Sequence, residues 1–357
     1  MKKIGIVTTS MGQGGVERFT AVLSKLLSQQ GYEVHIIITK NEVNYDYSGK
    51  LFNLQLHLNN KNSNISKLRI LRSYFKKNNF DFIIDNRTRP QFLKAFIIYK
   101  YVFKAKKIIS IVHSYHLKNY LPNSIFLAHL LYKQVTVLAV SKGLQNKISF
   151  KYDFKNCKQI YNPANTLNIV KKSNEEISID DKFILFYGRI EEHVKNLTLA
   201  LNAYKSSLLV ENGFKFYVIG SGPDESLLKK TIKELQLEQY VVLMPYLKNP
   251  FPYVKNAFFT VLTSRYEGLA MVLIESLSCG TPVVSVDCKV GPSEIIQHKY
   301  NGLLIENHNV IALANAFNMF IEDKILYNYC KNNAQISVQR FSFENIAKAW
   351  RELLETP

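Results

Sequence analysis

The sequence has few cysteines and no long apolar run. Its four cysteines show no CxxC spacing in 357 residues, so neither a disulfide framework nor a cysteine-based zinc site is predicted. No uncharged stretch reaches the roughly 18 apolar residues that a membrane-spanning helix requires. The start MKKIGIVTTSMG is basic but loses its apolar character too early for a signal peptide. We therefore expect free thiols and a cytoplasmic location.

Acidic residues are scarce in the first half of the chain. Residues 1–165 hold 26 Lys and Arg but only 7 Asp and Glu, whereas residues 166–357 hold 20 and 21. The first half thus carries the whole excess behind the net charge of +18. A surface this basic attracts polyanions, and either nucleic acid or an anionic membrane surface would fit.

Short apolar runs alternate with helix-like stretches along the whole chain. A chain of 357 residues favours two domains over one, and continuous β-branched runs are typical of parallel strands covered on both faces. We therefore predict an α/β protein with two doubly wound parallel-sheet domains, residues 1–165 and 166–340. A polar linker is expected within 162–181, and 341–357 should form a helix that packs across the domains. The predicted strands cover 2–9, 32–40, 80–85, 106–114 and 135–141, then 182–189, 214–222, 240–246, 257–264 and 281–287.

Two glycine-rich loops lie between a predicted strand and a predicted helix. The first is TTSMGQGGVERFT (8–20) and the second is IGSGPDE (219–225). Backbone N–H groups and the positive end of a helix favour an anion such as phosphate in such a loop. Glu17 stands where a dinucleotide-binding loop has its third glycine, so that class is not predicted. For either loop alone, a tight turn without a ligand is an equal alternative.

Two cations in the second half are candidates for binding a diphosphate. Arg189 ends a predicted strand and Lys195 begins the next helix, so both are expected in the crevice where open α/β sheets bind ligands. Arg can make a forked contact with phosphate, and Lys acts as a point charge. The alternative is that both form surface salt bridges with Glu191 and Glu192.

The segment EGLAMVLIESLSCGTP places Glu267 and Glu275 in an otherwise apolar run. A helix from about Leu269 to Cys279 would separate them by about 12 Å along its axis. Carboxyl pairs of glycosidases lie only about 5–9.5 Å apart. We therefore expect the two glutamates to hold different parts of one long ligand, such as a nucleotide-sugar.

The order of these segments resembles the large family of retaining glycosyltransferases with the GT-B fold (family four). The resemblance rests on GQGGVER, the strand-end His of SIVHS, YNP, GRIEEHVKN, GSGPD, EGLAMVLIESLSCGTPVV and NGLL, which together span nearly the whole chain. It implies two Rossmann-like domains facing a cleft, and transfer of a hexose or N-acetylhexosamine from a UDP-sugar with retention of configuration. It also implies front-face attack, in which the leaving phosphate helps to deprotonate the acceptor.

The resemblance also assigns roles to individual residues. It makes Arg189 and Lys195 the diphosphate-binding pair and places Glu275 on the donor ribose. The catalytic group it implies is Glu267, His113, Arg189 and Lys195. The other implied donor contacts are Gly14, Gly15, Gly220, Met244, Tyr246, Leu247, Gly268 and Leu269, with the nucleobase near 244–247. The implied acceptor contacts are Gly15, Arg18, Asn86, Arg87 and His113.

No metal or other cofactor is expected. The sequence has no Asp-x-Asp, the motif with which the other large glycosyltransferase architecture holds a divalent ion, and no HExxH. Two cations suffice for the leaving diphosphate. Without the resemblance, His113 would be interpreted as an ordinary hydrogen-bonded residue at a strand end, and His116 lies close enough to be confused with it.

Three segments of the first half are rich in aromatic and other apolar residues; two of them also carry several lysines or arginines, and the third is uncharged until its last residue. Segments 64–78, 91–107 and 119–133 are typical of helices on an anionic leaflet, and the alternative is a solvated lysine-rich face over a core. We expect a lipid-linked oligosaccharide or a lipopolysaccharide or capsule precursor as acceptor, at the inner face of the cell membrane. A sugar phosphorylase or nucleotide-sugar epimerase of the same architecture is the alternative. A nucleic-acid-binding protein is disfavoured because no binding motif for nucleic acid is present.

Overall fold

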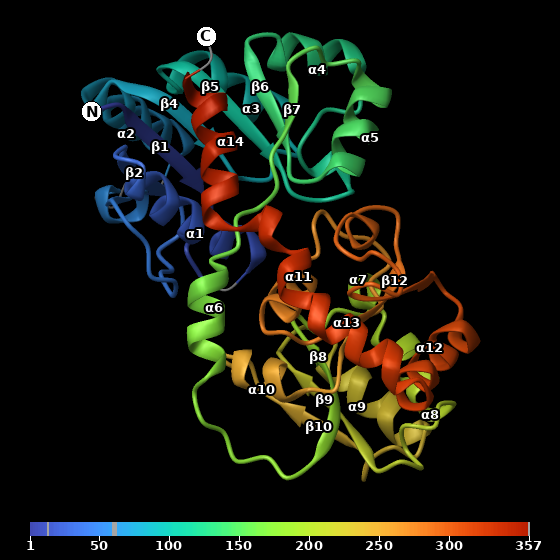
Figure 1. Cartoon of the computed structure of the whole chain (residues 1–357). Coiled ribbons are helices and arrows are strands. Elements are labelled where there is room, and N and C mark those ends of the chain that lie inside the picture. Colours follow the sequence, from blue (N-terminus) through green and yellow to red (C-terminus); the bar gives the residue numbers. More distant parts are fainter. Residues whose placement is uncertain (13, 59–62, 356–357) are drawn as a thin grey trace. The chain divides into compact units, whose positions relative to one another are not determined.

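The computed structural model describes residues 1–12, 14–58 and 63–355, which divide into two units (Figure 1). The first unit contains Met1–Pro163 and the last helix, α14 (Phe343–Glu355), and the second contains Ala164–Ser342. Each unit is built on one parallel sheet with helices packed against it.

The first unit has a seven-stranded sheet in the order β3-β2-β1-β4-β5-β6-β7, and its strand pairs are parallel. The central strands are apolar along most of their length and are buried accordingly, as continuous β-branched runs require. The strands are β1 (Lys3–Thr8), β2 (Glu33–Ile38), β3 (Lys50–Asn53), β4 (Phe80–Asp85), β5 (Ala105–Val112), β6 (Val135–Ala139) and β7 (Cys157–Gln159).

The helices of the first unit begin and end at residues with capping chemistry. Ser63 accepts a hydrogen bond from Ser66 N at the start of α2, and Ser124 does the same for Leu127 N in α4. Asn79 ends α2 in the left-handed conformation. The helices are α1 (Gly15–Gln29), α2 (Asn64–Asn78), α3 (Phe92–Ile97), the π-helix η2 (Ile98–Val102), α4 (Ile125–Tyr132) and α5 (Lys142–Tyr152), with 3₁₀ turns η1 (Leu54–His57) and η3 (Leu117–Asn119).

The second unit has a six-stranded parallel sheet in the order β10-β9-β8-β11-β12-β13. Fully buried Phe216, Phe259 and Phe317 form part of its core. The strands are β8 (Lys182–Tyr187), β9 (Phe214–Ile219), β10 (Val241–Met244), β11 (Thr260–Leu262), β12 (Val283–Asp287) and β13 (Gly302–Glu306). The helices are α6 (Thr166–Ser173), α7 (Glu192–Lys195), α8 (Leu197–Lys205), α9 (Glu225–Glu234), α10 (Phe251–Asn256), α11 (Met271–Ser278), α12 (Val310–Glu322) and α13 (Lys324–Ser337), with 3₁₀ turns η4 (Pro292–Glu294) and η5 (Gln339–Phe341).

The chain passes between the units twice, after Pro163 and after Ser342. The two passages are neighbours, because Ala164 N donates a hydrogen bond to Phe341 O at 2.8 Å. Beyond the second passage, α14 joins the first unit, where Ala347 O accepts from Gln30 Nε2 at 2.7 Å and Leu353 O accepts from Lys107 Nζ at 2.8 Å. Its apolar stripe Ile346, Trp350 and Leu354 is buried.

The predicted fold class, two doubly wound parallel sheets, is confirmed. All ten predicted strands are present, but β3, β7 and β13 were not predicted. The predicted boundaries at 165 and 340 lie two residues from the passages in the structure. Packing of the last helix across the domains stays a prediction.

Candidate functional site

A loop in the second unit holds the junction between α7 and α8. Thr263 Oγ1 donates to Lys195 O at 2.9 Å, and Arg265 N donates to Val194 O at 2.8 Å. Arg265 also reaches Asn196 Oδ1 at 2.8 Å. Asn196 takes the left-handed conformation that lets α7 end and α8 begin. These bonds fix Lys195 against a loop about 70 residues later in the sequence.

Lys195 and Glu267, both predicted site residues, contact each other. Lys195 Nζ lies 2.6 Å from Glu267 Oε1, and Ser264 Oγ donates to the same oxygen at 2.7 Å. The side chains are 19% and 13% exposed. Lys195 was expected to begin a helix and to pair, if at all, with Glu191 or Glu192. It instead ends the short helix α7, and its partner is Glu267.

Arg189 forms the salt bridge that the alternative interpretation predicted. Arg189 Nε lies 3.1 Å from Glu191 Oε2, and its side chain is 68% exposed. Such exposed pairs contribute about 0–1 kcal/mol to stability. Arg189 therefore keeps a solvated guanidinium at the end of β8.

The second glycine loop packs against the loop that carries Arg189. A Cβ at Gly220 would overlap Gly188 O, and a Cβ at Gly222 would overlap Ile190 O. Ile190 N donates to Ser221 O at 2.9 Å. These glycines are therefore required by close approach of two backbones. The structure gives Gly220 this structural role, and its predicted donor contact stays a prediction.

Glu275 is buried in α11, and the residue is only 2% exposed. Tyr187 Oη lies 3.3 Å from its Oε2 and donates to Val272 O at 2.8 Å. The helix starts at Met271 rather than near Leu269. The predicted helix is thus present, and it ends at Ser278. Because residues 267–270 form a loop, helical rise does not give the separation of Glu267 and Glu275, and the predicted separation stays a prediction.

The other predicted donor residues of the second unit lie at the ends of its strands or on the loops that follow them. Leu269 is buried, and a Cβ at Gly291 would lie 3.3 Å from Glu267 Cβ, so the loop after β12 packs on the 267–270 loop that includes Gly268. Met244 ends β10, and Met244 O accepts from Gly220 N at 3.0 Å. The predicted nucleobase contacts Tyr246 and Leu247 follow that strand, and the Tyr246 ring is 40% exposed.

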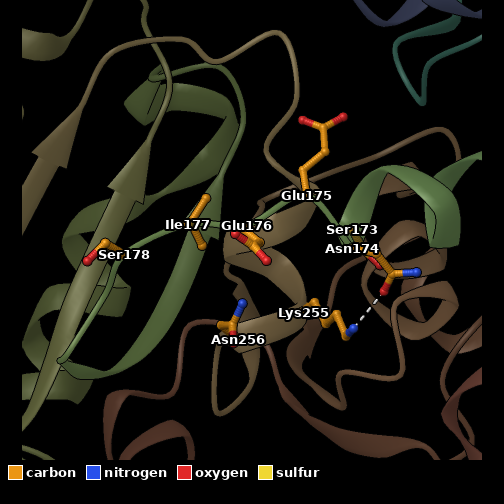
Figure 2. Close-up of a pocket in the computed structure, with 8 residues that line it drawn as sticks. All are labelled: Ser173, Asn174, Glu175, Glu176, Ile177, Ser178, Lys255 and Asn256. Atoms are coloured by element: carbon orange, nitrogen blue, oxygen red, sulfur yellow. Dashed lines mark hydrogen bonds between the residues drawn. The ribbon is translucent and has the colours of Figure 1, made fainter.

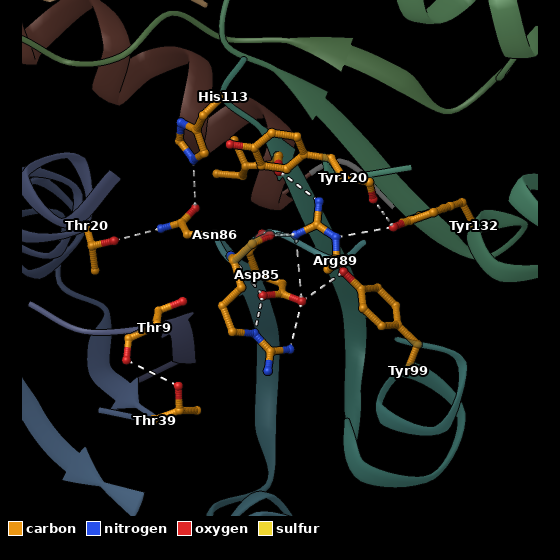
Figure 3. Close-up of polar contacts among 12 residues, drawn as sticks. Thr9, Thr20, Thr39, Asp85, Asn86, Arg89, Tyr99, His113, Tyr120 and Tyr132 are labelled. Carbon is orange, nitrogen blue, oxygen red and sulfur yellow. Dashed lines mark hydrogen bonds and ion pairs between the residues drawn. The ribbon is translucent and has the colours of Figure 1, made fainter. Parts of the chain in front are cut away.

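In the first unit, His113 and Asn86 follow neighbouring strands and meet (Figure 3). His113 Nε2 lies 3.4 Å from Asn86 Oδ1, and Asn86 Nδ2 donates to Thr20 Oγ1 at 3.0 Å. Because Asn86 Oδ1 can only accept, His113 Nε2 donates and Nδ1 is left as an acceptor. The Phe19 ring packs edge-on against the half-buried imidazole, with centroids 4.8 Å apart.

The imidazole of His113 is neutral at physiological pH. Burial, and to a smaller degree the Arg89 guanidinium, lower its pKa to about 3. Both effects disfavour the charged form.

A buried ionic network lies beneath this pair, and its central residues, Asp85 and Arg89, were not predicted from the sequence (Figure 3). Asp85 is fully buried, and Arg87 makes a forked contact with it at 2.8 and 3.0 Å. Tyr99 donates to Asp85 Oδ2 at 3.0 Å. The nearby guanidinium groups lower the pKa of Asp85 against the effect of its burial. The side chain of Arg87 is thus paired with Asp85, and its predicted acceptor contact stays a prediction.

Arg89 joins the ends of two strands. Its guanidinium donates to Asp85 O at 3.2 Å, to Arg87 O, and to Ile111 O at 2.9 Å. It also donates to Tyr132 Oη at 3.2 Å. Arg89 thereby fixes the strand ends from which Asn86 and His113 extend. The segment DNRTRP at a strand end was the available signal.

The remaining predicted residues of the first unit lie at the start of α1. Gly14 is the N-terminal cap, and Arg18 N donates to Gly14 O at 3.0 Å. A Cβ at Gly15 would meet no atom within 4 Å. Open space in the first glycine loop is therefore found at Gly15, whereas a Cβ at Gly12 or Gly14 would meet the side chain of Glu42 or Glu17.

A pocket of about 550 Å³ in the second unit contains none of the predicted residues (Figure 2). Within the described residues, no cluster of three His, Cys, Asp or Glu could hold a metal ion. No helix in that part of the chain is long and apolar enough to cross a membrane. The pocket is lined by Ser173, Asn174, Glu175, Glu176, Ile177, Ser178, Lys255 and Asn256.

Comparison with known proteins decides the family. Residues 13–166 match the model "Glycosyltransferase Family 4", and residues 169–337 match "Glycosyl transferases group 1". The chain is 32% identical, over 98% of both lengths, to the N-acetylgalactosamine-N,N'-diacetylbacillosaminyl-diphospho-undecaprenol 4-alpha-N-acetylgalactosaminyltransferase of Campylobacter jejuni. The chain belongs to the group 1 glycosyltransferases. This glycosyltransferase is also 28% identical, over 99% of its length and 98% of the relative's, to a second Campylobacter jejuni enzyme, the GalNAc-alpha-(1->4)-GalNAc-alpha-(1->3)-diNAcBac-PP-undecaprenol alpha-1,4-N-acetyl-D-galactosaminyltransferase.

Solved structures share the fold of the glycosyltransferase. A TarM variant of S. aureus, in complex with Fondaparinux, alpha-GlcNAc-glycerol and UDP, superposes with a TM-score of 0.81 over 100% of both chains at 16% identity. Anabaena HepE in complex with UDP and glucose superposes with a TM-score of 0.79 over 99% of both chains at 18% identity. These GT-B neighbours agree with the two parallel sheets described above.

Proposed function

We propose that this glycosyltransferase transfers an N-acetylhexosamine from a UDP-sugar, with retention of configuration, to a glycan carried on a lipid diphosphate. The carrying observation is the 32% identity over 98% of both lengths to an enzyme named for a diphospho-undecaprenol acceptor. A second relative of full length is named for the same class of acceptor. The family alone would also allow a hexose. The predicted location at the inner face of the cell membrane stays a prediction.

Lys195 is the proposed partner of the leaving diphosphate. Its ammonium is held by Glu267 at 2.6 Å, so it needs no ordering when the donor binds. Both bonds to Glu267 use Oε1, so Oε2 is the oxygen proposed to accept from a hydroxyl of the donor sugar. Arg189 has a mostly exposed guanidinium, and we propose that it leaves Glu191 for the diphosphate.

The proposed reaction is a front-face displacement. The acceptor hydroxyl oxygen bonds to the anomeric carbon on the side from which UDP departs, and the bond between that carbon and the phosphate oxygen breaks. The hydroxyl proton passes to the leaving phosphate. His113, whose pKa is lowered to about 3, is too weak a base for this step near neutral pH. We assign it a positioning role, through the acceptor lone pair on Nδ1.

The reaction is tested with purified protein and a synthetic N-acetylhexosaminyl diphosphate on a short, water-soluble prenyl chain. UDP-GalNAc, UDP-GlcNAc, UDP-glucose and UDP-galactose are offered separately, with and without EDTA, and the products are analysed by mass spectrometry and proton NMR. We expect one added N-acetylhexosamine, undiminished by EDTA, with an anomeric proton coupling that reports retention. Isomerised donor without transfer would instead identify an epimerase, and sugar 1-phosphate formed from a glycan and inorganic phosphate would identify a phosphorylase.

A further inference from the structure

Four helical segments of the first unit cover the same face of its sheet. The connections β3 to β4, β4 to β5, β5 to β6 and β6 to β7 all advance in one direction across the sheet. Right-handed crossovers then place α2, α3 with η2, α4 and α5 on one face and α1 on the other. Neighbouring helices on this face touch, α2 with η2, α3 with α4 and α4 with α5 (Figure 1). We call it the α2–α5 face.

The α2–α5 face has no acidic side chain in any of its helices. Helix α2 carries five Lys or Arg, α5 carries three, and α3 and η2 carry one each, without a single Asp or Glu. On the opposite face, α1 and α14 together carry four basic and four acidic residues. The positive charge of the first unit is therefore concentrated on one side of its sheet.

Helix α4 has no charged residue, yet it exposes apolar side chains on this basic face. Its inner side buries Ala128, Leu131 and Tyr132, whereas Phe126 is 75% exposed and Leu130 is 43% exposed. The helices on either side continue this apolar exposure, with Leu93 in α3 at 74% and Phe150 in α5 at 95%. His129 Nε2, 2.7 Å from Tyr152 O, fixes α4 to the end of α5.

The combination identifies the kind of partner. An uncharged apolar helix between lysine-bearing helices matches the boundary between headgroups and acyl chains, where apolar side chains enter and cations stay at the phosphates. Nucleic acid would have no use for the apolar side chains of α4. A second copy would bring two basic faces together, and like charges repel.

We propose that the α2–α5 face docks on an anionic lipid bilayer, with Phe126 and Phe150 entering the interface and the flanking lysines on the headgroups. The partner is the lipid bilayer, so the docking role of the α2–α5 face does not depend on which sugar is transferred. The proposal rests on the proposed function only in that a lipid-linked acceptor lies in the same bilayer.

The first test is flotation of the full chain with vesicles of phosphatidylcholine alone or mixed with phosphatidylglycerol. We expect flotation with the anionic vesicles, loss at high salt, and at least about 10-fold weaker partitioning of the double variant Phe126→Ser/Phe150→Ser. Ile311→Ser is the matched control, because Ile311 is 74% exposed on α12 of the second unit. Equal flotation of the double variant and wild type would overturn the proposal.

The second test uses tryptophan fluorescence. The native Trp350 is buried, with 1% exposure, so it gives a constant background. Phe126→Trp should shift its emission to the blue when phosphatidylglycerol vesicles are added, and Ile311→Trp should not. No shift, or the same shift from both, would overturn the proposal. Phe126→Ser should keep full activity on the water-soluble acceptor, so a failed membrane test and a failed transferase assignment are distinguishable.

Discussion

The two units share one architecture but differ in what lies beside particular glycines of their glycine-rich loops. The backbone of residues 188–190 occupies the space that a side chain at Gly220 or Gly222 would need. Nothing lies within 4 Å of a Cβ placed on Gly15. Their charges differ as well. The first unit carries 28 Lys and Arg against 10 Asp and Glu, and the second carries 18 of each. The shared fold thus requires similar buried strands in both units, whereas surface charge and the space beside the loops differ between them.

The first unit has a buried ionic network around Asp85, whereas the Arg189 ion pair of the second unit is exposed. Removing the Asp85 carboxylate should therefore lower stability more than any other change considered below. Asp85→Asn leaves the charges of Arg87 and Arg89 without a counterion and should destabilise the first unit by about 3–5 kcal/mol. Trp350, the one tryptophan, is buried in the first unit and reports its unfolding in urea. Glu191→Gln removes the partner of the exposed Arg189 in the second unit. It should change the free energy of unfolding of that unit by about 0–1 kcal/mol, measured by circular dichroism in urea. Equal effects of the two variants would break the comparison.

The second largest effect is expected from Lys195→Ala, which should lower the turnover rate. Loss of one preorganised cation at the leaving group lowers the rate by about 10²- to 10³-fold. Lys195 lies in the second unit, so urea unfolding followed through Trp350 should be unchanged. Lys205→Ala, an exposed lysine on the following helix, is the control and should keep wild-type turnover. An active Lys195→Ala enzyme would contradict the proposed role.

Alanine at a glycine of each loop separates the two loops directly. Gly222→Ala forces the backbone near Ile190 O to move and should destabilise the second unit by about 1–3 kcal/mol, as overpacking does. Gly15→Ala meets no atom, so thermal unfolding followed by circular dichroism should stay within about 1 kcal/mol of wild type. If the open first loop receives ligand, Gly15→Ala should raise KM. Unchanged KM would limit this loop to a turn.

The smallest effect is expected from the pH dependence of His113. Its pKa is about 3 in the folded state and 6.5 as the ordinary value, so between these values the unfolded chain binds more protons. The stability of the first unit should therefore fall as pH decreases below about 6.5. His113→Asn removes this contribution, so urea unfolding at pH 7 and pH 5 should show a weaker dependence. A variant with the wild-type dependence would show that His113 is not its source.

Some strands and site residues could be predicted from the sequence, and others could not. The ten predicted strands are continuous apolar runs, but β3 (KLFN) and β7 (CKQ) are short edge strands and pair on one side only. Sequence order placed Lys195 and Glu267 in one site, yet their contact depends on the loop before α11. Asp85 and Arg89 were missed because a polar segment at a strand end looks solvated until the fold buries it.

The return of α14 to the first unit has a consequence for synthesis. Ile346, Trp350 and Leu354 are buried against elements made more than 200 residues earlier. A ribosome releases the whole second unit before it releases these side chains. Until α14 leaves the ribosome, the first unit therefore has an uncovered apolar strip beside α1, and chaperones have most to protect during that interval.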